Sequence, residues 1–306
     1  MARREPTTFV QSLTPFDADE RLDEVALRLH LRRLGSAGIG VYMASAGSGE
    51  GNTLDAEETR RVLGIGAEEL KGKVPVRAMG IEPRTAKQMI EYCRMAQDAG
   101  LDAVQVFNVE MGHGNRPNDA ELEEYFFSVL RAVKMPVTIA THRFSGYVIP
   151  IGLMTKLVER FDHIIGINCS QPDVAYLTRL IDAVGDRVDV HVGGPDQALT
   201  VLALGGQGFL SSEGNLAPRL CMRVIDSFKS GNLPGVNDAF GKLLRLYTTN
   251  VKFGNMRGIK AALRQLGLPG GQTRRPRLIA SEEAGRELVD TFESLDLRTI
   301  EGLAEA

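Results

Sequence analysis

Short apolar runs alternate with amphipathic stretches along the first 218 residues, and this alternation constrains the fold more than any other feature. Each run has the length of a strand, and each stretch carries apolar residues at helical spacing. Strands that alternate with helices form parallel sheets, and eight such units predict an α/β fold of the TIM-barrel type, a (β/α)8 barrel. The expected strands are residues 8–13, 38–45, 74–79, 101–108, 136–141, a sixth that begins at 164, 188–192 and 208–211.

The pattern changes near residue 219, after which it is helical only. Helical spacing continues to residue 229 and returns at 238–247, 258–266 and 281–295. No glycine- or serine-rich linker separates the two parts. We therefore expect a barrel of residues 1–218 with a C-terminal helical extension, residues 219–306, packed on it.

The sixth predicted strand runs into a polar cluster, in the sequence IIGINCSQ at residues 164–171. Alternation along a strand turns Asn168 to the same side as Gly166 and turns Cys169 to the opposite side, toward the helices. A parallel barrel presents its site at the carboxyl ends of its strands. Asn168 is therefore a candidate site residue, whereas Cys169 is expected to be a buried, inert thiol.

Several motifs follow one another in the chain order of a known family. They are TPF at 14–16, AGSGEGNTLDAEE at 46–58, GG at 205–206 with FLSSEGNLAP at 209–218, and IKAAL at 259–263 with RRPRL at 274–278. By these motifs the chain resembles the dihydrodipicolinate synthase / N-acetylneuraminate lyase family, aldolases and dehydratases that act on 2-oxo acids. The resemblance covers nearly the whole chain. It implies the barrel fold, a small carboxylate substrate and a homo-oligomer that is a dimer of dimers.

The resemblance breaks at Asn168. The family has a lysine there, which forms a Schiff base with the substrate ketone, and an amide cannot form an imine. A tyrosine of the family aligns with Ala140, and a neighbouring pair aligns with His113 and Gly114. The covalent chemistry of the family is therefore expected to be missing, and the site has to be argued separately from the fold.

The loop AGSGEG follows the second predicted strand. Its small residues let backbone N–H groups turn toward an anion, and Ser48 adds a hydroxyl donor. In the family this loop holds the substrate carboxylate, so Gly47, Ser48 and Gly49 are predicted to bind substrate, and Ser48 also to assist catalysis. A plain tight turn is the alternative. Glu50 is expected to brace the loop.

His142 and Arg143 end the fifth predicted strand. If Ala140 faces inward, alternation turns His142 inward too, at the mouth of the barrel. Imidazole is well suited to move protons near neutral pH, so His142 is the predicted acid/base. A histidine that only makes loop hydrogen bonds is the alternative. Arg143 falls close to the arginine that, in synthases of the family, meets a second carboxylate, and it is predicted to bind substrate.

The seventh predicted strand places Asp189 and His191 on its inward side. With Arg77 they could form a satisfied core network as readily as a site, and the structural interpretation is preferred. His30 and His163 are also expected to be structural.

Three more residues complete the predicted substrate contacts. His113 lies in the loop after the fourth strand, Gly194 follows the seventh strand, and Ser211 ends the eighth.

Composition argues against several classes of partner. The formal net charge is −3 and no basic run stands out, which excludes nucleic-acid binding as a main task. The N-terminus MARREPTT lacks an apolar signal core, and no stretch approaches the roughly 18 apolar residues of a membrane span. Three widely spaced cysteines suit free thiols in a reducing cytoplasm, so a soluble cytoplasmic chain is expected.

No cofactor is predicted. His113, His142, Glu110 and Cys169 could lie at the barrel rim, but the chain has no HxH or i, i+4 pair that would indicate a metal site. A divalent metal stays an alternative.

Three hypotheses follow. In the first, the chain is a lyase-like enzyme on a small carboxylated substrate, with Asn168 and Ser48 polarising a carbonyl and His142 as acid/base, without an imine. In the second, a metal replaces the lysine as electron sink. In the third, the chain is an inactive relative that binds a 2-oxo acid, and Ala140 favours this one. Polar rather than apolar replacements of the lysine and tyrosines favour the first.

Overall fold

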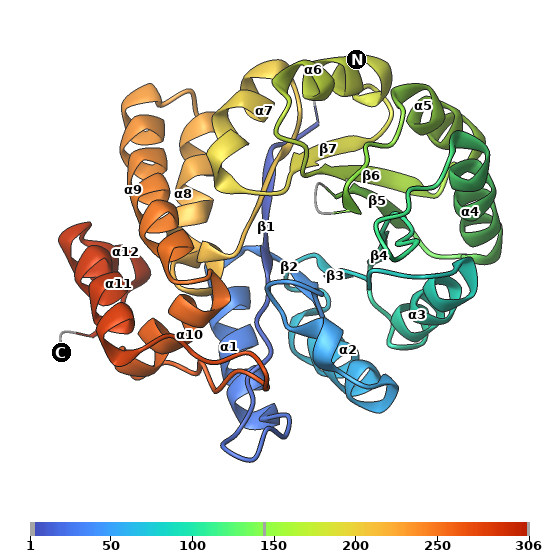
Figure 1. The fold of residues 1–306 in the computed structure, drawn as a ribbon. Helices are drawn as coiled ribbons and strands as arrows, with labels where there is room; N and C mark the ends of the chain where they lie inside the picture. Colours follow the sequence, from blue (N-terminus) through green and yellow to red (C-terminus); the bar gives the residue numbers. More distant parts are fainter. Residues whose placement is uncertain (1–3, 143–144, 305–306) are drawn as a thin grey trace. The chain divides into compact units, whose positions relative to one another are not determined.

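The computed structural model describes residues 4–142 and 145–304 of the chain. Within these residues, eight parallel strands follow one another in chain order around a closed barrel (Figure 1). The (β/α)8 fold expected from the alternation is therefore confirmed. The strands are β1 (Thr7–Gln11), β2 (Gly40–Met43), β3 (Val76–Ala78), β4 (Ala103–Val106), β5 (Val137–Thr141), β6 (Ile164–Cys169), β7 (Asp189–Val192) and β8 (Gly208–Ser211).

A helix follows each strand, as the barrel architecture requires, and further helices end the chain. The α-helices are α1 (Glu24–Ala37), α2 (Ala56–Leu70), α3 (Ala86–Asp98), α4 (Asp119–Ala132), α5 (Ile151–Arg160), α6 (Val174–Val184), α7 (Ala198–Leu204), α8 (Pro218–Lys229), α9 (Leu233–Lys252), α10 (Met256–Gln265), α11 (Glu282–Ser294) and α12 (Leu297–Glu301). Short 3₁₀ turns are η1 (Gly51–Thr53), η3 (Pro195–Gln197) and η4 (Glu213–Asn215).

Side-chain caps determine where two of these helices begin. Asp55, the N-cap of α2, accepts hydrogen bonds from the first turn, and the Glu58 carboxylate accepts one from the backbone N–H of Asp55. Asn118 and Glu121 form the same reciprocal arrangement at α4. Each cap satisfies backbone N–H groups that have no partner inside the helix, a contribution of about 1 kcal/mol.

The chain divides into two compact units. One contains residues 77–209 with the N-terminal segment up to Pro6, and the other contains residues 7–76 and 210–306. The boundary predicted after residue 218 coincides with the first residue of α8, which lies inside the second unit.

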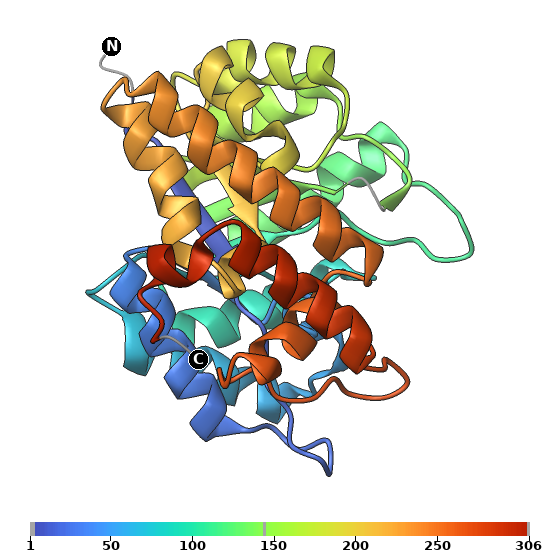
Figure 2. The same cartoon turned by 90° about the vertical axis from the view of Figure 1, so that its left-hand side faces the viewer.

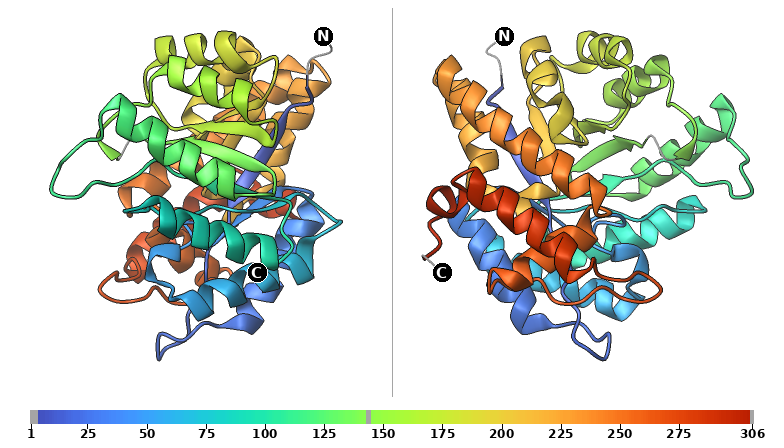
Figure 3. Two further views of the ribbon diagram at one scale, coloured as in Figure 1. Left: turned by 90° about the vertical axis from the view of Figure 1, so that its right-hand side faces the viewer. Right: turned by 60° about the vertical axis from the view of Figure 1, so that its left-hand side comes forward.

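Strands β4 to β7 and helices α3 to α7 build the first unit, with α4 to α7 along the outer side of the strands (Figures 1 and 3). Val106, Ile139, Ile167 and Val190 lie in register across these strands, and all four are fully buried. Because side chains alternate along a strand, the polar residues beside this apolar row face the opposite side. This alternation positions the candidate site.

The C-terminal helices belong to the second unit (Figure 2). Helix α8 packs along α9, α10 packs on α11, and α11 also contacts α9. Helices were expected over the same segments as α8 to α11, and α12 was not expected.

Helix α9 begins five residues earlier than the predicted start at residue 238. Asn232 caps it by accepting a hydrogen bond from the backbone of Gly235, and Pro234 occupies the first turn, where its missing N–H costs nothing. Pro and Gly disfavour helix interiors, but in LPG at residues 233–235 they lie at a helix start.

His30 of α1 is a buried structural histidine, as expected. Its Nε2 lies 2.9 Å from Oδ1 of Asn215, and the amide nitrogen of Asn215 donates to the carbonyls of Gln11 and Ser212. The oxygen of Asn215 therefore faces His30, so Nε2 carries the proton of a neutral ring. Burial, with the charge of Arg33 as a smaller cause, lowers the pKa of His30 to about 3.

This pKa predicts a pH-dependent stability. Between about pH 3 and 6.5 the unfolded chain binds a proton at His30 that the folded chain does not, so the free energy of unfolding rises with pH. His30→Gln should reduce that slope by up to about 1.4 kcal/mol per pH unit between pH 6 and 4. Urea unfolding at several pH values measures it. An unchanged slope in the variant would show that His30 is not the neutral group described.

Candidate active site

The register of the first unit places Ala140, Asn168 and His191 side by side on neighbouring strands β5, β6 and β7. All three are buried. One step earlier along the strands, Gln105, Thr138 and Gly166 form the next row. The strand alternation predicted for Asn168 therefore gathers polar side chains on the side away from the apolar core row.

Asn168 is held by a second amide. Its Nδ2 donates to Oε1 of Gln105, and Nε2 of Gln105 contacts the sulfur of Met79 at 2.8 Å. Gln105 and Asn168 are both buried, so this bond forms where no bulk water competes. This hydrogen bond fixes the orientation of the Asn168 amide, with its nitrogen toward Gln105. Gln105 was not predicted as a site residue from the sequence, although a polar residue within the apolar strand AVQVF could have indicated one.

His142 directly follows β5 and is half-buried. Its ring packs edge-on against Phe107, with ring centres 5.5 Å apart. Asn108 Oδ1 lies 3.4 Å from its backbone nitrogen, and Ser145 Oγ donates to its carbonyl at 2.7 Å. Asn108 in turn donates to Ser145 at 2.6 Å. Asn108 and Ser145, which the sequence analysis did not single out, thus fix the backbone that carries the imidazole.

Ser48 belongs to a hydroxyl–amide cluster of the second unit. Its Oγ lies 3.0 Å from Oε1 of Gln11 and 2.8 Å from Oγ of Ser212. Oγ of Ser212 is also 3.4 Å from Oε1 of Gln11, so either serine hydroxyl can donate to that oxygen while it accepts from the other serine. Among the described residues, only the side-chain oxygen of the Gln11 amide group makes hydrogen bonds, both of them with serine hydroxyls.

The glycines of the loop differ in how much space a side chain would have at each position. A Cβ at Gly49 would lie 2.7 Å from the carbonyl oxygen of Ser12, and one at Gly51 would collide with the carbonyl of Ala44. Only glycine fits at these two positions. At Gly47, which is exposed, a Cβ would meet nothing within 4 Å. The space at Gly47 is therefore open.

Glu50 braces this loop through a fully buried ion pair with Lys260 of α10. The Lys260 ammonium also donates to the carbonyls of Thr14 and Gln272, each at 2.7 Å, so all three of its hydrogens are used. Burial lowers the pKa of Lys260 to about 8, against the opposing effect of Glu50. The backbone of Glu50 has a φ of 54°, in the left-handed region. The loop is thus held in one conformation by charge pairing.

The comparisons with known proteins agree with this fold. A model of the dihydrodipicolinate synthetase family matches residues 7–295. The chain belongs to this family. It is 29% identical to the 4-hydroxy-tetrahydrodipicolinate synthase of Methanopyrus kandleri, covering 93% of this chain and 94% of that protein, and 27% identical to a DapA-like lyase of Pyrococcus abyssi, covering 94% and 97%.

Solved structures of the dihydrodipicolinate synthetase family superimpose on the chain. YagE, a family member from Escherichia coli K12 in complex with pyruvate, has a TM-score of 0.86 and 26% identity, covering 95% of this chain and 99% of YagE. The synthase of Aquifex aeolicus has a TM-score of 0.87 at 22% identity, covering 95% and 98%, which shows the fold. The chain is therefore a lyase-type member of the aldolase superfamily.

The remaining predicted contacts of this family member lie in different surroundings. His113 is exposed in a turn, and Gly194 is half-buried before η3. Ser211 is buried and donates to Glu213 at 2.9 Å, whereas the next residue, Ser212, contacts Ser48. Arg143 lies outside the described residues.

Two side chains expected to be structural are buried in the first unit. Cys169 is a free thiol whose pKa burial raises to about 11, which leaves it protonated and inert near neutral pH. Burial, with the charge of Arg77, lowers the pKa of His191 to about 3. The carboxylate of Asp189 is 3.3 Å from Arg4, a partner that the sequence analysis did not consider.

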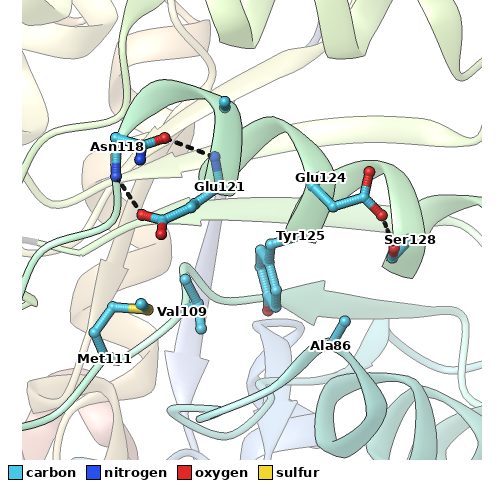
Figure 4. Close-up of a pocket in the computed structure, with 9 residues that line it drawn as sticks. Ala86, Val109, Met111, Asn118, Glu121, Glu124, Tyr125 and Ser128 are labelled. Atoms are coloured by element: carbon cyan, nitrogen blue, oxygen red, sulfur yellow. Dashed lines mark hydrogen bonds between the residues drawn. The ribbon is translucent and has the colours of Figure 1, made fainter.

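A separate pocket of about 470 Å³ lies against α4 (Figure 4). Its lining includes Val109, Met111 and Tyr125, and none of the predicted site residues. Asn118 and Glu121, the capping pair of α4, lie at one side of it. This pocket is therefore distinct from the polar groups described above.

Neither a metal-binding cluster nor a membrane-spanning helix occurs in the described residues. Over residues 4–142 and 145–304, no group of three or more histidine, cysteine, aspartate or glutamate side chains is placed to hold a metal ion. In the same residues, no helix is long and apolar enough to cross a membrane.

The buried ion pair predicts a large mutational effect. Glu50→Gln should lower the free energy of unfolding by about 3–5 kcal/mol, because it leaves the buried Lys260 ammonium without a counter-charge. Glu20→Gln is the matched control: Glu20 also has a positive φ, of 66°, but pairs with the largely exposed Arg275. The control should cost at most about 1 kcal/mol. Urea unfolding compares them, and equal losses would contradict the bracing role of Glu50.

Proposed function

We propose that this chain is a lyase of the aldolase, dehydratase or hydratase type that acts on a small 2-oxo acid or related carboxylate without forming an imine. The observation that carries the proposal is the amide pair of Asn168 and Gln105. It occupies the place where the resemblance puts the family's lysine. Pyruvate, the ligand in the YagE complex, supports a 2-oxo acid as the class of substrate.

Asn168 would act through hydrogen bonding alone. An amide N–H aimed at a carbonyl oxygen stabilises the negative charge that develops there when an enolate or alkoxide forms. Such a donor is effective only when it is already oriented, because reorientation during the reaction costs free energy. Gln105 supplies that orientation from β4.

His142 is the proposed acid/base. Its ring is half-buried against Phe107, and its backbone is tied to Ser145, so the imidazole has a defined place and keeps contact with solvent. Proton transfer to or from a substrate carbon or hydroxyl is the step that a lyase without an imine still needs.

Ser48 and the backbone N–H groups of Gly47 and Gly49 are proposed to receive the substrate carboxylate. The Gln11 amide and the Ser212 hydroxyl support this assignment, because they position the Ser48 oxygen. On substrate binding the Ser48 proton would turn from Gln11 to the carboxylate, and Ser212, 3.4 Å from Oε1 of Gln11, would donate to Gln11 instead. Substrate contacts of His113, Arg143, Gly194 and Ser211 remain predictions, as do the dimer of dimers, the cytoplasmic location and the absence of a required cofactor.

An inactive relative that binds a 2-oxo acid is the second candidate. Ala140, next to Asn168 in register, supports it, because a buried methyl group replaces the family's tyrosine. Turnover by the wild-type chain on any 2-oxo acid or its aldol product would exclude this candidate.

Borohydride trapping tests the absence of an imine. Wild-type protein incubated with pyruvate and sodium borohydride should keep its mass, since residue 168 carries no primary amine. Asn168→Lys is the matched control, because its amine replaces the amide at the same position and is expected to be trapped. A pyruvate adduct on a specific lysine of the wild-type chain, found by mass spectrometry, would overturn the proposal.

The role of His142 predicts a change in rate with little change in stability. His142→Ala should lower turnover by roughly 10²–10⁴-fold and alter the free energy of unfolding by no more than about 1 kcal/mol. His163→Ala, at a histidine before β6, should leave the rate close to that of the wild type. Steady-state kinetics of the three proteins measure this, and unchanged turnover in His142→Ala would remove the residue from the mechanism.

A further inference from the structure

Arg277 lies beside the carboxylate-binding loop of the proposed function. Its Nη1 donates to the carbonyl oxygen of Gly47 at 3.3 Å. The backbone around it is fixed, since its nitrogen donates to the carbonyl of Arg274 at 3.1 Å and its carbonyl accepts from Thr273 at 2.8 Å. The side chain is 29% exposed, so part of it is open to solvent.

The charges around Arg277 are not balanced. Glu50 is 4.0 Å from its Nη1, but both oxygens of Glu50 are already used, one by Lys260 and the other by the backbone N–H of Arg274. The neighbouring cations have carboxylates of their own. Arg274 pairs with Glu58 at 2.6 Å, and Arg275 pairs with Glu20. Among the described residues of this segment, Arg277 has the longest ion-pair contact, its 4.0 Å approach to a Glu50 that it shares with Lys260.

Open space adjoins this cation. Gly47 is exposed and a Cβ there would meet nothing within 4 Å, in contrast to the crowded Gly49 and Gly51. Neither packing nor a positive φ requires glycine at residue 47. A partly exposed arginine beside an open position is suited to a carboxylate, which its planar fork can bind through two parallel hydrogen bonds.

We propose that Arg277 binds a second carboxylate of the substrate in the open space beside Gly47, so that the chain prefers 2-oxo dicarboxylates over 2-oxo monocarboxylates. This inference rests on the proposed function, in which Ser48 receives the first carboxylate. Arg277 then determines specificity rather than taking part in the reaction, and it differs from Arg143, the arginine suggested by the family resemblance.

Two ligands of equal chain length test the preference. 2-Oxoglutarate and 2-oxopentanoate differ in the terminal carboxylate that replaces a methyl group, and calorimetric titration of the full chain gives their dissociation constants. We expect 2-oxoglutarate to bind at least about 10-fold more tightly, since a charge-assisted bidentate contact is strong. Arg277→Leu should abolish that ratio with little effect on 2-oxopentanoate, and Arg277→Lys should retain part of it.

Arg275→Leu is the matched control, because it removes an exposed arginine two residues away that is paired with Glu20. It should keep the wild-type ratio. A ratio near one in the wild type, or one lost in Arg143→Leu but kept in Arg277→Leu, would overturn the assignment to Arg277 while the 2-oxo-acid site stands. Binding of neither ligand would overturn the proposed function as well.

Discussion

A buried ion pair between Glu50 and Lys260 organises the second unit. The ring centre of Phe16, from the motif TPF, lies 5.0 Å from the Lys260 ammonium nitrogen and 4.2 Å from the guanidinium carbon of Arg274. Motifs far apart in the sequence therefore meet at one charged contact, and the loop that carries Ser48 is fixed by it. Because two buried charges are costly unless each satisfies the other, the loop has little freedom to move away from this geometry.

The alternation of apolar runs was enough to predict the barrel, and it also placed Asn168 and Cys169 on opposite sides of β6. It could not find Gln105, whose contact with Asn168 joins residues 63 positions apart. The loop sequence alone was enough to predict that Glu50 braces the loop. Its partner Lys260 could be identified only from the folded structure. Ser211 was predicted as a substrate contact at the end of β8, whereas Ser212, one residue past the end of that strand, is the hydroxyl that contacts Ser48.

This chain belongs to the family but lacks the lysine and the tyrosine that the family resemblance places at residues 168 and 140. The chain has the fold of the dihydrodipicolinate synthetase family and belongs to it, whereas residue 168 carries an amide and residue 140 a methyl group. An amide can stabilise charge through hydrogen bonds but cannot form an imine with a ketone, so the proposed mechanism relies on the placement of hydrogen-bond donors and of one proton-transfer group. The Gln105–Asn168 bond and the Asn108–Ser145 support of His142 are arrangements of this kind.

A crystal structure of the protein with pyruvate bound tests the central claim most directly. A noncovalent site predicts an intact ketone whose carbonyl oxygen accepts a hydrogen bond from the amide of Asn168, with no bond between its carbonyl carbon and any protein nitrogen. Electron density continuous from that carbon to a lysine nitrogen would contradict the account.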